Sequence, residues 1–417
     1  MSILGTHAIK ETSLAVNRND NEHHRIVTEP KSSELSLHVV YLGFTEQILV
    51  VCTGPCGEAF YFIEKENVKD LLQKSLSIHK YIDKLVGDEG EVKAVTKAQR
   101  KRLSDKLREL GEFLFSAVFR EDILDIFNMT IGQASMANAG VLIRIMIAND
   151  FLNIIPWELL CDNKTYLCHI YDIIRHPFIH QPVQYVNSHT GDIRVLFVGA
   201  NPLGDIRVRG QIDAVKAAIE SRNIGFRSLL SPNANYKEIA NVIYDGVDIL
   251  HFLAHGKYEE NGDHRNYYFI IDNEDINKKQ DRLPIEMLES FCRANPMYFA
   301  VLNACKSDQA VNYNLKSINT LVEAKQYSMA HALIQTGVPC VIGMSHPISK
   351  IGAELFTRRL YRTVIDRKES IGKAVRLIRL ELFAHSDDLL PSDWLTPVLY
   401  SRDRQVDSPI LAQELSE

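Results

Sequence analysis

The chain has 417 residues, of which 46% are hydrophobic and 24% charged, and its formal net charge is −6. This composition excludes a disordered or fibrous protein and leaves space for two or three globular domains. The small acidic charge gives no reason to expect nucleic acid or an anionic membrane as a direct partner. No apolar run approaches the roughly 20 residues of a membrane helix, and no leader pattern begins the chain. We therefore expect a cytoplasmic protein.

The cysteines indicate reduced thiols. Their number is odd, and most stand in apolar sequence, which argues against a disulfide framework. Two of them, Cys52 and Cys56, flank a turn, but no second pair at metal-binding spacing lies near them. We predict no metal and no cofactor. The seven cysteines are Cys52, Cys56, Cys161, Cys168, Cys292, Cys305 and Cys340.

The first part of the chain predicts a small α+β region. Residues 1–35 are polar and predict a flexible N-terminal arm. From Ser36 the apolar residues alternate in three short runs, which predicts an antiparallel meander. Residues 66–133 show helical spacing, and strands are expected just after Gly140 and over 165–176. We assign residues 36–190 to this N-terminal region.

From residue 191 strands and helices alternate, which predicts a mostly parallel sheet with helices on both faces. The fold class is therefore α/β, and residues 191–417 form the predicted main domain. Five strands are expected: 193–200, 226–230, the run ending at His255, the run ending at Cys305, and 338–344. Helices are expected over 209–222, 233–244, 284–293, 328–335, 350–366 and 369–385, with a hairpin near 266–273.

Two of these strands end in reactive residues. VDILHFLAHG ends in His255 and Gly256, and YFAVLNACKSD carries Cys305. Chemistry in open parallel sheets lies just beyond the carboxyl ends of the strands. If the strands are neighbours, the imidazole of His255 serves as general base for the thiol of Cys305. The backbone N–H groups of Gly256 and Cys305 are our candidates for the oxyanion site.

Other functions fit the residues less well. The glycines after the 193–200 strand lack the spacing of a dinucleotide-binding loop, and no phosphate-binding GxxxxGK[ST] motif occurs. His251 and His255 stand four residues apart, about 13 Å along a strand, which is too far for one metal ion. We expect His251 to be a core histidine. A metal-dependent hydrolase using His251, His255 and Cys292 is the remaining metal alternative.

Several motifs together resemble the CHAT-domain branch of the caspase-like (clan CD) cysteine peptidases. They are VDILHFLAHG, VLNACKSD, SMAHALIQTGVPCVIGMSHPIS, AELFTRRLYRTV, SIGKAVRLIRLEL, IPWELLCD and NPLGD, within residues 36–400. The resemblance implies a caspase-type sheet, a catalytic dyad of His255 and Cys305, and cysteine endopeptidase activity on protein substrates without a cofactor. It also implies frequent control by a partner protein in bacterial defence and cell death.

The resemblance also implies a substrate-binding region. The residue two before the nucleophile, here Asn303, lines the S1 pocket of related peptidases, and a neutral amide there argues against a strongly basic P1 residue. We assign Asp205, Ser345 and His346 to the same region. His346 and Lys350 replace a tryptophan and an acid common in the family, and Lys306–Asp308 replace ESG. The polar segment 309–327 is predicted to be an activation loop, cut or ordered by an activator. The alternative function is an inactive caspase-like scaffold.

Overall fold

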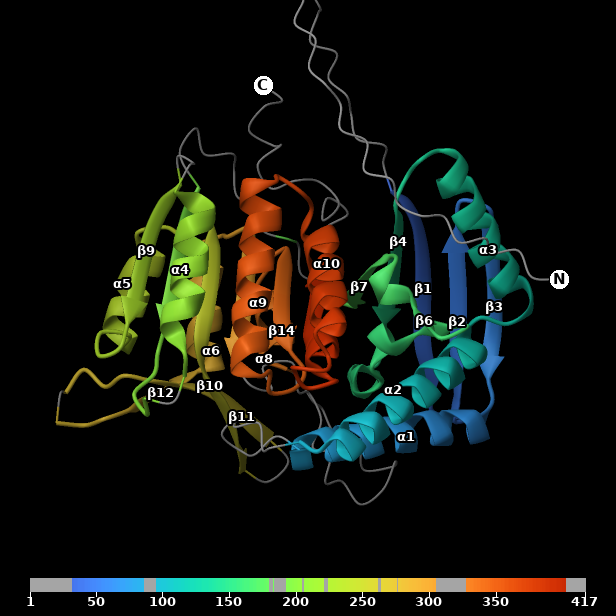
Figure 1. Cartoon of the computed structure of the whole chain (residues 1–417), viewed down its shortest axis with the longest axis horizontal. Coiled ribbons are helices and arrows are strands. Elements are labelled where there is room, and N and C mark those ends of the chain that lie inside the picture. The colour runs from blue at the N-terminus through green and yellow to red at the C-terminus, as the bar shows by residue number, and fades with distance from the viewer. Residues whose placement is uncertain are drawn as a thin grey trace, which may run out of the picture.

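The protein forms one long mixed sheet flanked by helices (Figure 1). The structure is a computed structural model that describes residues 32–85, 95–179, 183, 193–204, 206–220, 224–261, 264–275, 277–304 and 328–402. Thirteen strands of these segments belong to the sheet. Its path is β12-β11-β10-β13-β14-β15-β7-β4-β1-β2-β3, with β8 and β9 joined to β10.

The predicted N-terminal meander is present at one end of the sheet. Three strands pair antiparallel in sequence order, because their apolar residues alternate and tight turns join them. Leu35, Leu37 and Val39 face the core, and the residues between them are only partly buried. The first strand starts at Ser33, three residues before the predicted start at Ser36. Residues 1–31 of the predicted arm lie outside the described residues. The strands are β1 (Ser33–Leu42), β2 (Gln47–Gly54) and β3 (Gly57–Ile63).

Three amphipathic helices cover the meander and are followed by a parallel strand, as predicted. The second helix begins with a capping box, in which the Thr96 side chain accepts from the Gln99 backbone and the Gln99 side chain from the Thr96 backbone. The strand after Gly140 pairs parallel with β1. These elements are α1 (Lys65–Leu85), α2 (Lys97–Val118), α3 (Glu121–Met136) and β4 (Val141–Ile147).

The expected strand over 165–176 is replaced by shorter pieces. Two residues pair in a small separate hairpin, a 3₁₀ turn follows, and only the last part joins the main sheet beside β4. The apolar run is interrupted because its middle packs as a turn against the C-terminal helices. The pieces are η1 (Asp150–Ile154), η2 (Trp157–Leu159), β5 (Cys161–Asp162), β6 (Thr165–Tyr166), η3 (Leu167–His169) and β7 (Asp172–Pro177).

The second half confirms the five predicted parallel strands, in the order β9-β8-β10-β13-β14. Its strands are β8 (Arg194–Gly199), β9 (Gly225–Leu230), β10 (Ile249–Asn261), β11 (His264–Ile271), β12 (Asp281–Pro284), β13 (Phe299–Ala304), β14 (Cys340–Met344) and β15 (Pro397–Ser401). Its helices are α4 (Val208–Ile219), α5 (Tyr236–Tyr244), α6 (Ile285–Ala294), α8 (Met329–Gln335), α9 (Lys350–Tyr361), η4 (Arg362–Asp366), α10 (Ile371–Ala384) and η5 (Asp393–Leu395).

Two cores lie on opposite faces of this half. Side chains of a strand alternate between faces, so Ile249 and Leu253 of β10 join one core and Leu250 joins the other. The first core includes residues of α4, α9 and α10, which stand in front of the sheet in Figure 1. The second includes residues of α5, α6 and α8. Both faces are covered, as expected for parallel strands.

The two halves share the sheet through one strand that the sequence did not predict. β15 pairs antiparallel with β14 and touches β7 at the single pair Tyr400↔Arg175. The division at residue 190 therefore stays a prediction about folding units. Across the ranges given above, no helix has the length and apolar character needed to span a bilayer.

Candidate active site

His255 lies where β10 leaves the parallel sheet. Residues 249–254 of β10 pair with β13, and the last two pairs are Leu253↔Asn303 and Ala254↔Ala304. From His255 onward the strand instead pairs antiparallel with β11, beginning at His255↔Ile270. The prediction that the strand ends at His255 is therefore wrong, because the hairpin extends it through Asn261.

The partner residue of the predicted dyad lies outside the described residues. Cys305 follows Ala304 directly in the sequence, and Ala304 is the last described residue of β13. The structure does confirm that the two strands are parallel neighbours, which was the condition set by the sequence. The His255 side chain is 8% exposed. The dyad, and the oxyanion role of Gly256 and Cys305, stay predictions.

His251 is a core residue, as predicted. Its side chain is fully buried, between the rings of Phe197 and Tyr361 at centroid distances of 4.8 and 5.7 Å. The Tyr361 hydroxyl lies 3.3 Å from Nδ1 of His251. Burial lowers the pKa of His251 to about 3, so the ring is neutral at physiological pH. It is therefore a packed, neutral core residue.

The described segments bring together no group of three His, Cys, Asp or Glu residues that could hold a metal ion. In the metal alternative, His251 packs with rings of the first core, whereas Cys292 belongs to the second core on the other face of the sheet. Burial also raises the pKa of the Cys292 thiol to about 12, which opposes the thiolate form that binds metals. The arrangement of these residues does not favour a metal site.

Asn303 is the polar residue of the otherwise apolar strand β13, and its side chain is hydrogen-bonded. Its side chain is 4% exposed, and Nδ2 donates to Oε1 of Gln211 at 2.7 Å. The Thr357 hydroxyl donates to the same oxygen at 2.9 Å. Gln211 was not predicted from the sequence, because its partners lie 92 and 146 residues away.

Ser345 and His346 begin the loop after β14. The Ser345 backbone N–H and hydroxyl both donate to the carbonyl of Thr396, at 2.9 and 3.2 Å. Ser345 keeps part of its surface exposed, whereas His346 is only 1% exposed. Asp205 lies outside the described segments. The substrate-binding roles of Asn303, Asp205, Ser345 and His346 stay predictions, and among the last two Ser345 offers more surface to a ligand.

His346 instead contacts a histidine of the N-terminal half. Its Nε2 lies 2.9 Å from Nδ1 of His79 on α1, and Nε2 of His79 lies 2.7 Å from the carbonyl oxygen of Ile154. A carbonyl only accepts, so Nε2 of His79 donates and Nδ1 accepts from Nε2 of His346. Burial, with His346 as a second cause, lowers the pKa of His79 to about 3. The His79 ring is therefore neutral at physiological pH.

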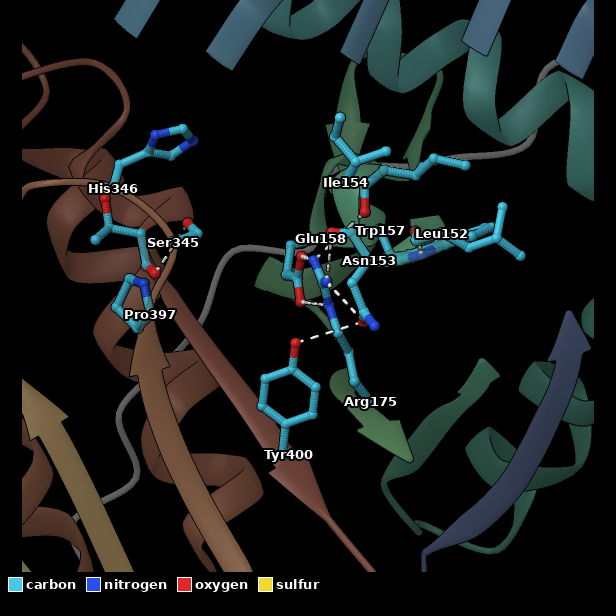
Figure 2. A network of polar contacts seen from close by, with 12 residues as sticks. Leu152, Asn153, Ile154, Trp157, Glu158, Arg175, Ser345, His346, Pro397 and Tyr400 are labelled. Carbon is cyan, nitrogen blue, oxygen red and sulfur yellow. Dashed lines mark hydrogen bonds and ion pairs between the residues drawn. The ribbon is translucent and has the colours of Figure 1, made fainter. Parts of the chain in front are cut away.

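A buried ion pair lies where the two halves meet (Figure 2). Arg175 of β7 donates to both carboxylate oxygens of Glu158, at 3.0 and 2.6 Å, and the two side chains are 3% and 1% exposed. Arg379 of α10, fully buried, lies 3.7 Å from the same carboxylate. Burial would raise the pKa of Glu158, but Arg175 and Arg379, with a backbone hydrogen bond, together outweigh it and the pKa is lowered. The IPWELLCD motif thus supplies the anion of this junction.

Comparison with known proteins decides the family. The model of the CHAT domain family matches residues 104–402. The chain belongs to the CHAT domain family. The resemblance drawn from the sequence motifs is thereby confirmed. No curated protein matches the sequence significantly.

Solved structures are similar to this chain at low sequence identity. Two crystal structures of the Saccharomyces cerevisiae separase–securin complex each share 10% identity, with TM-scores of 0.53 and 0.49. They cover 89% and 88% of this chain, which in turn spans 30% of the separase-complex chain in both cases. Gingipain R (RgpB) of Porphyromonas gingivalis, an Arg-specific cysteine proteinase, has TM-score 0.43 and 10% identity over 83% of this chain and 75% of its own. The separase structure with TM-score 0.53 confirms the predicted caspase-like α/β fold.

Proposed function

We propose that this CHAT domain protein is a cysteine endopeptidase that acts through His255 and Cys305. The register of two strands carries the proposal: β10 and β13 run parallel, and their last pair is Ala254↔Ala304. The next residue in the sequence is His255 after Ala254 and Cys305 after Ala304. Family membership and the shared fold of the separase complex support the same reaction class.

The proposed chemistry follows from the two groups. His255 accepts the thiol proton, and the thiolate of Cys305 attacks the carbonyl carbon of the scissile peptide bond. Backbone N–H groups of Gly256 and Cys305 bind the oxyanion while it forms. The C–N bond then breaks as His255 gives its proton to the leaving amine. A water molecule, deprotonated by His255, hydrolyses the resulting thioester and restores the thiol.

We also propose control by a partner protein. The separase structures contain securin, so a chain with this fold is known to be held in a protein complex. In this chain the control point would be the segment 309–327, which lies outside the described residues. The defence role and the proteolytic activation that the family implies remain part of the proposal. Limited proteolysis should show a changed cut in 309–327 when an activator is added, and identical fragments would argue against it.

Cleavage of a protein substrate tests the activity. The wild-type chain and Cys305→Ala should each be co-expressed with the proteins encoded beside the gene, and intact masses compared. We expect a fragment pair with the wild type alone, and its new C-terminus gives the P1 residue. Fragments in both samples would show a contaminating protease. No fragment with any neighbour, together with an unreactive Cys305, would favour the inactive scaffold.

A further inference from the structure

The buried contact of Gln211 links three elements beside the end of β13. Gln211 lies in the first turn of α4, Thr357 lies in α9, and Asn303 is the second-last residue of β13. One oxygen, Oε1 of Gln211, accepts from both Asn303 Nδ2 and the Thr357 hydroxyl. The three side chains are 2%, 0% and 4% exposed for Gln211, Thr357 and Asn303. The network is therefore sealed from water in the described structure.

Such a network has a cost that an apolar core would avoid. The other residues of β13 are Phe299, Ala300, Val301, Leu302 and Ala304, all apolar and buried. A buried amide destabilises the fold unless it is hydrogen-bonded, and two donors that share one acceptor restrict each other's arrangement. The amide of Asn303 is thus held in one direction relative to α4 and α9.

The position of Asn303 matters because both residues of the proposed dyad follow closely after it, one in register and one in sequence. In register, Asn303 is opposite Leu253, two residues before His255. In sequence, Asn303 is two residues before Cys305. The network therefore anchors the end of the β10–β13 pairing, just before the two residues of the proposed dyad.

Helix α4 also follows the loop whose sequence includes Asp205, a residue predicted to bind substrate. Asn201 closes this loop, since its Nδ2 donates to the Ile206 carbonyl at 3.0 Å and its Oδ1 accepts from the Ile206 N–H at 3.1 Å. α4 starts two residues later, at Val208. Gln211 thereby connects the base of this loop to the nucleophile strand.

We propose that Gln211 is a positioning residue for the peptidase reaction, acting through Asn303 to hold the end of β13 at a fixed distance from His255. This inference rests on the proposed function. Gln211 touches no reacting atom in this account. A displacement of about 1 Å between reacting groups costs as much as roughly 100-fold in rate, so a loss of this anchor lowers the rate of the chemical step more than it weakens substrate binding.

Three variants separate positioning from general packing. Gln211→Met keeps the length of the side chain but removes the acceptor. Gln211→Glu keeps an acceptor oxygen, since a buried carboxyl group is stable in its protonated form and retains its carbonyl oxygen. Thr357→Val is a milder change that removes one donor at nearly constant shape. Gln133→Met, at an exposed site on α3, is the matched control for the substitution itself.

The first measurement is the alkylation rate of Cys305 by iodoacetamide as a function of pH. We expect Gln211→Met to be roughly 10- to 100-fold slower at pH 7, with the midpoint of its pH profile shifted up toward the ordinary thiol value near 8.5. Gln211→Glu should restore the rate to within about threefold, and Gln133→Met should not change it. A folded Gln211→Met protein with the wild-type rate and profile would overturn the proposal.

The second measurement does not depend on activity. Amide hydrogen exchange over residues 299–304 reports whether the end of β13 is held, and it can be followed in Cys305→Ala as well. We expect faster exchange there in Gln211→Met and, more weakly, in Thr357→Val. If wild-type Cys305 proves unreactive, the proposed function fails and exchange alone decides the anchoring claim. Unchanged exchange in both variants would then overturn it, and if Gln211→Met does not fold, Thr357→Val decides.

Discussion

Glu158→Ala should destabilise the protein far more than a surface ion-pair deletion. The substitution leaves Arg175 and Arg379, 2% and 0% exposed, without the carboxylate that both contact. Removing one partner of a buried pair costs about 3–5 kcal/mol, because the remaining charge stays buried and uncompensated. For 417 residues, an unfolding entropy of roughly 2.1 cal/mol/K per residue gives about 0.9 kcal/mol/K, so a loss of about 4 kcal/mol lowers Tm by about 4–5 °C if the halves unfold together.

Asp245→Ala is the matched control. Asp245 and Arg227 are also 2.6 Å apart, but their side chains are 62% and 61% exposed. Such a pair contributes at most about 1 kcal/mol. Urea unfolding followed by tryptophan fluorescence measures both variants, because the chain has two tryptophans, and Trp157 and Trp394 are both buried. Equal losses for the two variants, or a loss below about 1 kcal/mol for Glu158→Ala, would refute the argument.

Three further predictions concern acid stability, the histidine contact and a helix cap. Burial holds the pKa of both His79 and His251 at about 3 in the folded protein. Their contribution to stability is complete above about pH 6.5, the ordinary histidine pKa, and is lost as the pH falls toward 3. Each histidine costs about 2 kcal/mol of stability at pH 5. Asp150 and Asp393, whose pKa burial raises to about 6, act with the opposite sign over the same range. Urea unfolding from pH 7.5 to 4.5 measures the net loss, and a flat profile would contradict it. His79→Leu should reduce the proton uptake on acid unfolding by about one proton. It should also loosen the loop at His346, which faster amide exchange over 344–350 would show. An unchanged pH dependence of stability counts against the contact. Ser370→Ala should cost about 1 kcal/mol, because the Ser370 side chain accepts from the Lys373 N–H at the start of α10; a change below 0.3 kcal/mol would show that the cap is dispensable.

The parallel half of the fold was predictable because its signals are local. Each buried strand is a short apolar run, and several of the helices begin at a capping Ser or Asn. The Ser328 cap and the α8 helix follow this pattern, since the Ser328 hydroxyl accepts from the His331 N–H. Adjacency of β10 and β13 was a condition of the dyad hypothesis, and the structure meets it. The dyad itself stays a prediction.

Long-range polar partners were not predictable from one sequence. His79 and His346 are 267 residues apart, and nothing in the spacing near either residue announces the other. Gln211 is one polar residue among others on an amphipathic helix, and its role is seen only when α9 and β13 pack on it. The length of β10 was misjudged for a related reason. Gly256 suggests an end to the strand, but pairing with β11 compensates for glycine's low strand preference and continues it.

The central claim is that His255 activates Cys305, and the alkylation rate of Cys305 tests it most directly. Buried cysteines provide an internal reference, because burial raises the thiol pKa to about 12 for Cys52, Cys168 and Cys292. With Cys56, which is partly exposed, replaced by serine, peptide mass analysis at pH 7 should find iodoacetamide on Cys305 first. We predict a rate at least about tenfold lower in His255→Ala, since the thiol then lacks its base. Equal rates in the two proteins would contradict the dyad.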